Sequence, residues 1–108
     1  MNRVELGKIK KLTVGIGGYQ DAQLGVSVEL GGSGWGVCDF FGTWATHTER
    51  CKWTPAEQRG ILADTMLRIR DLLADANVAT TDKLIGKPIE ATFDGGILKS
   101  WRILKEVL

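Results

Sequence analysis

Residues 23–41, QLGVSVELGGSGWGVCDFF, contain the pattern that decides the fold. Over 23–30 apolar residues alternate with polar residues and glycine, and this period of two is typical of a strand with one buried face. The face predicted to be buried carries Leu24, Val26, Val28 and Leu30. GGSG at 31–34 predicts a hairpin turn, and WGVCDFF at 35–41 predicts a third strand that is covered on both faces, at least in part.

The segment before this stretch predicts one more strand. Residues 8–16, KIKKLTVGI, place Leu12, Val14 and Ile16 on one face, opposite Lys11 and Thr13. GGYQDA at 17–22 breaks the alternation and predicts a connecting loop. The three strands together indicate an antiparallel meander.

The segment after this stretch predicts a helix. Thr54 is suited to the N-cap, Pro55 to the first helical position and Glu57 to a capping box. The helix is expected to run to about Asn77 after an irregular segment at 42–53. Its apolar stripe comprises Ile61, Leu62, Met66, Ile69, Leu72, Leu73 and Ala76, with Leu67 on the outward half. This stripe is expected to pack on the sheet.

The C-terminal segment predicts a hairpin. Residues 80–86 indicate a short helical turn that ends at Gly86, and 88–94 alternate again. The Asp-Gly-Gly run at 94–96 is a hairpin turn, followed by a last strand over 97–104. The expected fold is α+β, in a single domain over 1–108: an antiparallel sheet of about five strands (βββ–α–ββ) with one long amphipathic helix on one face.

Composition places the chain among ordinary globular proteins. Hydrophobic residues make up 44% and charged residues 25%, and the formal net charge of +1 provides no overall field for nucleic acid or a membrane. No apolar run approaches the roughly 18 residues that span a bilayer. We therefore expect a cytoplasmic protein without a membrane partner, whose cysteines, Cys38 and Cys51, are free thiols. Cys38 is expected to be a small buried residue.

A candidate binding site is suggested by the segment from Gly15 to Trp53, which holds three of the four tryptophans and most of the glycines. Tyr19, Gln20 and Asp21 form a polar turn between strands, where binding groups tend to lie. Trp35, Asp39 and Trp44 would add apolar walls and a polar contact. An ordinary turn with a local side-chain hydrogen bond is the alternative interpretation of 19–21.

Catalytic and cofactor motifs are weak in this chain. The glycine clusters at 15–18 and 31–36 lead into strands, whereas a phosphate loop leads into a helix. Cys38, His47 and Cys51 follow a C-x8-H-x3-C spacing that matches no standard zinc motif. A metal- or thiol-dependent enzyme that uses these residues with Asp39 or Glu49 stays an alternative, but no cofactor is expected.

Nucleic-acid binding is a further alternative. The first and last predicted strands carry basic residues that would form a local patch beside aromatic rings if the strands were neighbours or edges: Lys8, Lys10, Lys11, Lys99, Arg102 and Lys105. Single-stranded nucleic acid would suit such a patch, although no recognised nucleic-acid-binding motif is present. Lysines at sheet edges also protect against aggregation.

Three strings indicate a resemblance that covers nearly the whole chain. GGYQDA (17–22), GSGWGVCDFFGTWA (32–45) and LIGKPIEATFDGGILKSWRILKEVL (84–108) resemble short proteins encoded by tailed bacteriophages and prophages. The resemblance implies an accessory protein at work in a bacterial cytoplasm and implies no reaction. We therefore expect a non-catalytic module that binds a host protein or a small ligand through its Gly/Trp-rich face. The exposed edges of the predicted sheet and Leu67 offer a surface for a second copy, so a homodimer stays an open alternative.

Overall fold

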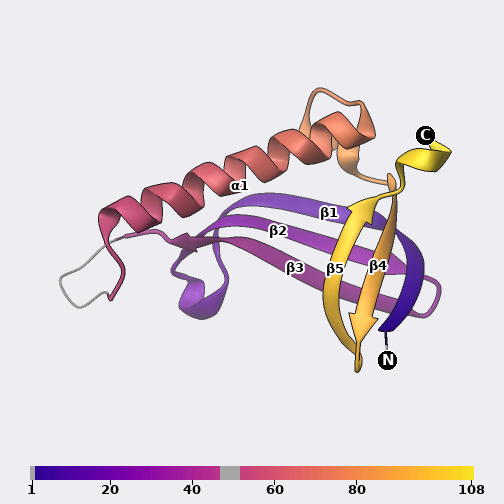
Figure 1. Ribbon diagram of the computed structural model, residues 1–108, viewed down its shortest axis with the longest axis horizontal. Coiled ribbons are helices and arrows are strands. Elements are labelled where there is room, and N and C mark those ends of the chain that lie inside the picture. Colours follow the sequence, from indigo (N-terminus) through magenta and orange to yellow (C-terminus); the bar gives the residue numbers. More distant parts are fainter. Residues whose placement is uncertain (1, 47–51) are drawn as a thin grey trace.

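The computed structural model describes residues 2–46 and 52–108, apart from the side chain of Tyr19. Five antiparallel strands form one sheet in the order β3-β2-β1-β4-β5, and helix α1 covers one face of it (Figure 1). The strands are β1 (Asn2–Gly17), β2 (Gln23–Gly32), β3 (Trp35–Trp44), β4 (Pro88–Asp94) and β5 (Ile97–Ile103), and the helix is α1 (Pro55–Ala76). The predicted α+β fold and its βββ–α–ββ order are confirmed.

Strand β1 is longer than the sequence predicted, and it joins the two halves of the sheet. Residues 2–8 pair with β4 and residues 8–17 pair with β2, with a β-bulge between Ile9 and Lys11. The expected strand began at Lys8, so its first six residues were missed. In these residues the apolar side chains lie on the outer face of the sheet and the charged ones on the inner face, the reverse of the usual pattern. Val4 and Leu6 are exposed, whereas Arg3 lies against the ring of Phe93 in the core.

Helix α1 begins where the capping signal predicted. Thr54 is the N-cap, and its hydroxyl oxygen accepts a hydrogen bond from the backbone N–H of Glu57 at 3.1 Å. The helix ends at Asn77, which adopts the left-handed conformation. Such a cap satisfies backbone groups that the helix itself leaves unpaired.

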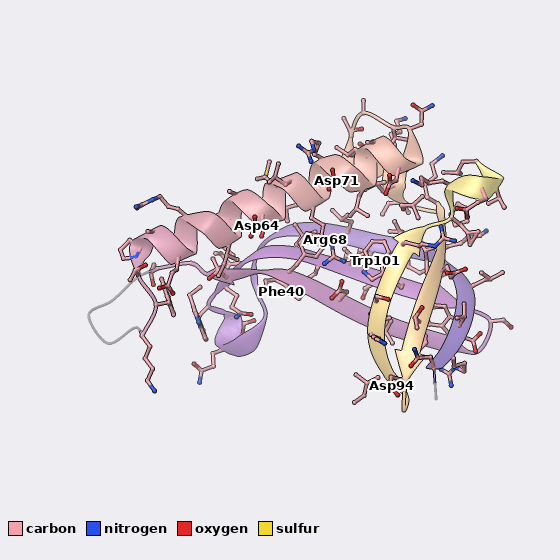
Figure 2. All side chains as sticks on the ribbon, in the orientation of Figure 1. Phe40, Asp64, Arg68, Asp71, Asp94 and Trp101 are labelled. Atoms are coloured by element: carbon pink, nitrogen blue, oxygen red, sulfur yellow. The ribbon has the colours of Figure 1, made fainter. Side chains whose placement is uncertain are left out.

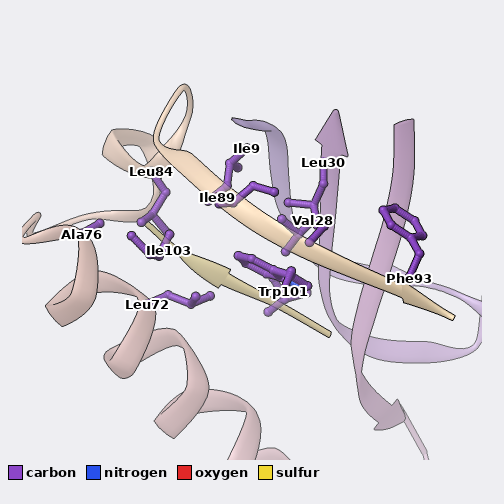
Figure 3. Packing of buried hydrophobic residues seen from close by; sticks show 12 residues of the cluster. Ile9, Val28, Leu30, Leu72, Ala76, Leu84, Ile89, Phe93, Trp101 and Ile103 are labelled. Carbon is purple, nitrogen blue, oxygen red and sulfur yellow. The ribbon is translucent and has the colours of Figure 1, made fainter. Parts of the chain in front are cut away.

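The core lies on the inner face of the sheet, between its two halves and the C-terminal part of α1 (Figure 3). Val26, Val28 and Leu30 are almost wholly buried, as their alternation predicted. Leu72 and Ala76 contribute from α1, and Trp101 contributes from β5. Residues from both sheet halves therefore share one core.

Part of the predicted apolar surface is not covered. Met66 belongs to the predicted stripe of the helix, yet 65% of it is exposed, and Ile61 is also exposed. Val14 and Ile16, on the predicted buried face of the first strand, are 58% and 61% exposed. The reason is the position of α1, which packs mainly on β3 and leaves the C-terminal half of β1 uncovered.

The turns and chain ends explain the remaining differences. Gly95 and Gly96 both have positive φ, at 60° and 84°, as a two-residue hairpin loop requires. Strand β3 continues to Trp44, into the segment expected to be irregular. Strand β5 ends at Ile103, one residue before the predicted end, and a 3-10 turn, Lys105–Val107, follows it. A further short turn, Thr81–Leu84, precedes Gly86, which adopts the expected positive φ of 86°.

Candidate functional site

A hollow lies on the outer face of the sheet, opposite α1. Its floor follows from the register: Lys8 lies across from Gly31, and Gly31 lies across from Gly36, so two of the three residues in this row have no side chain. The next outward row is Lys11, Glu29 and Cys38. The hollow measures about 490 Å³. Missing side chains, and not a cleft between elements, create it.

Two smaller hollows adjoin it. One of about 400 Å³ shares Lys10 and Gly31, and one of about 280 Å³ shares Glu29 and Cys38. We refer to the three together as the lysine-rimmed groove. Its lining includes the residues Lys8, Lys10, Lys11, Glu29, Gly31, Gly36 and Cys38.

The rim of this groove is basic. Lys8, Lys10 and Lys11 lie within four residues of β1, separated only by the buried Ile9, and all three are exposed. Glu29 is the carboxylate that lies opposite Lys11 in the register. The aliphatic part of Lys10 lies over Gly31, where an added Cβ would lie 3.3 Å from the Lys10 Cε. The bulge at Ile9/Lys11 brings two consecutive lysines opposite one glutamate, and so concentrates positive charge at the groove.

Strand β3 separates three of the predicted binding residues. Trp35 lies at its first residue, where its ring packs edge-on against Phe93 with centroids 5.5 Å apart. Asp39 lies in the middle of the strand, and Trp44 lies at its last residue. Only Trp35 lines the lysine-rimmed groove.

Asp39 belongs to a half-buried cluster under the helix, together with Arg68 and Trp101, which Figure 2 labels. Its Oδ2 accepts hydrogen bonds from Arg68 Nη2 at 3.1 Å and from Trp101 Nε1 at 2.7 Å. The Arg68 guanidinium also lies over the Phe41 ring, 4.3 Å from its centroid. The carboxylate is thus occupied by groups of the protein itself, which favours a structural role.

The predicted turn residues lie at the far end of β3 from Trp35. Tyr19, Gln20 and Asp21 form a 3-10 turn, in which Gln20 and Asp21 have φ of 56° and 50°. The Ala45 N–H donates to Ala22 O, so Trp44 lies near this turn. The structure therefore brings four of the six predicted residues to one end of β3, with Asp39 and Trp35 further along it.

The proposed metal or thiol set is only partly described. His47, Glu49 and Cys51 lie outside the described residues. Cys38 is exposed, and the expectation that it is buried is wrong, because its side chain lies on the outer face of the sheet, which none of the described elements covers. Over residues 2–46 and 52–108 no three His, Cys, Asp or Glu side chains are close enough to hold a metal ion.

The basic residues do not merge into one patch. Strand β4 lies between β1 and β5, which separates Lys8, Lys10 and Lys11 from the basic residues of the C-terminal strand. Arg102 pairs with Glu90 at 3.3 Å and with Glu106 at 2.8 Å, and these two carboxylates raise the pKa of its guanidinium. The first strand alone thus supplies the basic side chains of the groove.

Sequence reasoning missed Gly36, Glu29 and Cys38 as groove residues. Each lies at an outward position of a predicted strand, so the alternation itself was the available signal. It also missed Arg68 as the partner of Asp39, because the sequence shows Arg68 only as a basic residue of the predicted helix.

No family model matches the chain, and comparison with curated proteins and with solved structures finds no significant similarity to any of them. Among the described helices, none is long and apolar enough to cross a membrane.

Proposed function

We propose that the protein is a non-catalytic accessory protein of the phage type, and that it binds an acidic surface of a host protein in the lysine-rimmed groove. The observation that carries this proposal is a glycine floor beside three exposed basic side chains within four residues of β1, Lys8, Lys10 and Lys11. The bare backbone at the exposed Gly36 allows close approach of a partner, and the lysines supply complementary charge.

The shape of the groove favours a protein over a small molecule. Small-ligand sites usually enclose most of the ligand surface. Here the three hollows lie side by side on an open sheet face, across β1, β2 and β3. A projecting acidic loop or helix of a partner would fill such a groove along its length.

Gly36 offers a direct steric test. A Cβ at this position would meet only the Leu30 carbonyl oxygen, at 3.7 Å, so Gly36→Leu fills the hollow without a backbone clash. Gly60 in α1 is the matched control, because the space around it is also open and it lies on a different element. Circular dichroism and thermal unfolding check that both variants fold.

The experiment compares capture of host proteins by the two variants and the parent chain. We expect one protein to be recovered with the parent and with Gly60→Leu, and to be lost with Gly36→Leu. Binding of the purified partner should weaken with salt and with the double reversal K10E/K11E. Equal recovery with all three chains would refute the groove as the binding site. Salt-dependent binding of single-stranded DNA that K10E/K11E abolishes, without a protein partner, would favour the nucleic-acid alternative.

A further inference from the structure

Strand β1 has an open edge along its C-terminal half. On the side away from β2, β4 covers only residues 2–8, and the last described contacts there join Ile9 to Gly86 and Lys87. Within the described residues no strand pairs with 11–17 on this side. Although β1 is the central strand, half of it is thus a sheet edge.

The backbone of this edge is oriented for pairing. The N–H and C=O of Ile9 both point away from β2, because they bond to Lys87 and Gly86. Ile9 lies across from Leu30, and the positions two, four and six residues before Leu30 lie across from Leu12, Val14 and Ile16. Antiparallel pairing alternates strictly, so the N–H and C=O groups of these three residues also point outward.

The side chains beside this edge are apolar. Val14 and Ile16 project on the inner side of the sheet, and both are largely exposed. Between Val14 and α1 lies a hollow of about 230 Å³, lined by Leu24, Leu62, Met66 and Ile69 among others. An uncovered edge with an apolar wall is what strand addition uses for recognition.

The other two edges of the sheet are less suited to pairing. Strand β5 carries an irregularity in its register at Lys99 and has Arg102 on its surface. Bulges and charged side chains are devices that block edge pairing. Strand β3 has no largely exposed large apolar side chain among the described residues. The edge of β1 from Leu12 to Gly17 has no charged residue and no proline.

We propose that two copies of the chain form a dimer by antiparallel pairing of β1 with β1 around a two-fold axis at Val14. This register places Val14 opposite Val14 of the second copy and Leu12 opposite its Ile16. The three outward-facing residues of each copy then exchange about six backbone hydrogen bonds. Met66 of each copy, beside Val14, covers the apolar contact.

Charge supports a second copy as the occupant. In this register Lys11 lies opposite Gly17, and Thr13 lies opposite Gly15, so no like charges meet. On the inner side of the sheet the apolar face of each strand meets the same face of the other, so the polar side chains of Lys11 and Thr13 lie only on the outer side of the seam. A two-fold interface must be self-complementary in this way.

The test compares two valine-to-lysine variants of β1. Val14→Lys places like charges opposite each other at the two-fold axis, whereas Val4 has a similar exposure, 55%, and lies on the half of β1 that pairs with β4. Sedimentation velocity over a concentration series should show a dimer for the parent chain and for Val4→Lys. The dissociation constant of Val14→Lys should rise at least about tenfold. A monomeric parent chain, or equal dimerisation of the two variants, would overturn the proposal.

Charge complementation guards against a misfolded variant. An equimolar mixture of Val14→Lys and Val14→Glu should form a heterodimer at concentrations at which each variant alone is largely monomeric. If the mixture stays monomeric while both variants are folded, Val14 does not lie at the axis and the register is refuted. Gly36→Leu should dimerise as the parent does, because the lysine-rimmed groove is on the opposite face, so this proposal and the proposed function fail separately.

Discussion

The indole N–H of Trp101 donates a hydrogen bond to Oδ2 of Asp39 at 2.7 Å, and this bond joins the two edge strands of the sheet. Asp39 is on β3 and Trp101 is on β5, at opposite ends of the strand order. They can meet only because the sheet curls, and the division of β1 between two partners at its bulge allows the curl. Arg68 of α1 binds the same oxygen and so ties the helix to both strands.

Replacing Asp39 by alanine should destabilise the fold by about 1–3 kcal/mol, because it removes the acceptor of the Trp101 N–H and the partner of Arg68. Asp71 is the control: its ion pair with Arg70 is exposed on both sides, and Asp71→Ala should cost less than about 0.5 kcal/mol. Urea unfolding followed by Trp fluorescence measures both. Equal effects would show that the Asp39 cluster does not hold the curl.

The elements that depend on neighbouring residues were predictable from sequence. Thr54 caps its helix through Glu57, three residues on, and Gly95 and Gly96 form a loop between adjacent strands. The bond between Asp39 and Trp101 spans 62 residues, and no local pattern encodes such a contact. For the same reason the exposure of Val14 was not predicted, since it depends on where α1 crosses the sheet.

In the candidate site, too, the local features could be predicted from sequence and the contacts between distant residues could not. The glycine-rich segment and the three lysines of β1 were recognised as features of interest. Their meeting in one groove depends on the register that aligns Lys8, Gly31 and Gly36 across three strands. Alternation gives the face of each residue, but the register depends on the lengths of turns and on the bulge.

Glycine substitutions should have opposite effects in the helix and in the sheet. Gly60→Ala should stabilise the protein by about 0.5–1 kcal/mol, because Gly60 is exposed within α1 and its Cβ would meet no atom. Gly42→Ala should destabilise it, because a Cβ there would collide with the backbone of Leu24 and Gly25. Thermal unfolding of the two variants tests this. Destabilisation by Gly60→Ala would mean that this face of the helix is covered.

The C-terminal turn should depend on pH through Glu106. Its hydrogen bonds from Arg102 lower the pKa of the Glu106 carboxyl below its ordinary value. A lowered pKa in the folded state means that the contact contributes above the ordinary glutamate pKa and is lost as the pH falls through the folded value. A carbon-13 titration of the Glu106 side chain should show this pKa, and Arg102→Leu should raise it. A pKa that Arg102→Leu leaves unchanged would contradict the contact.

The thiol of Cys38 should react in the folded protein, because it is exposed on the outer face beside Glu29 and Gly36. In a Cys51→Ser background, a maleimide should modify Cys38 without denaturant, and urea should change the rate little. A bulky maleimide would also fill the lysine-rimmed groove, so it should prevent binding of the host partner, whereas methylation of the same thiol should not. Cys38→Ser treated with the reagent is the control and should bind as the untreated chain does. Protection of Cys38 until the protein unfolds would show that this face is covered in solution.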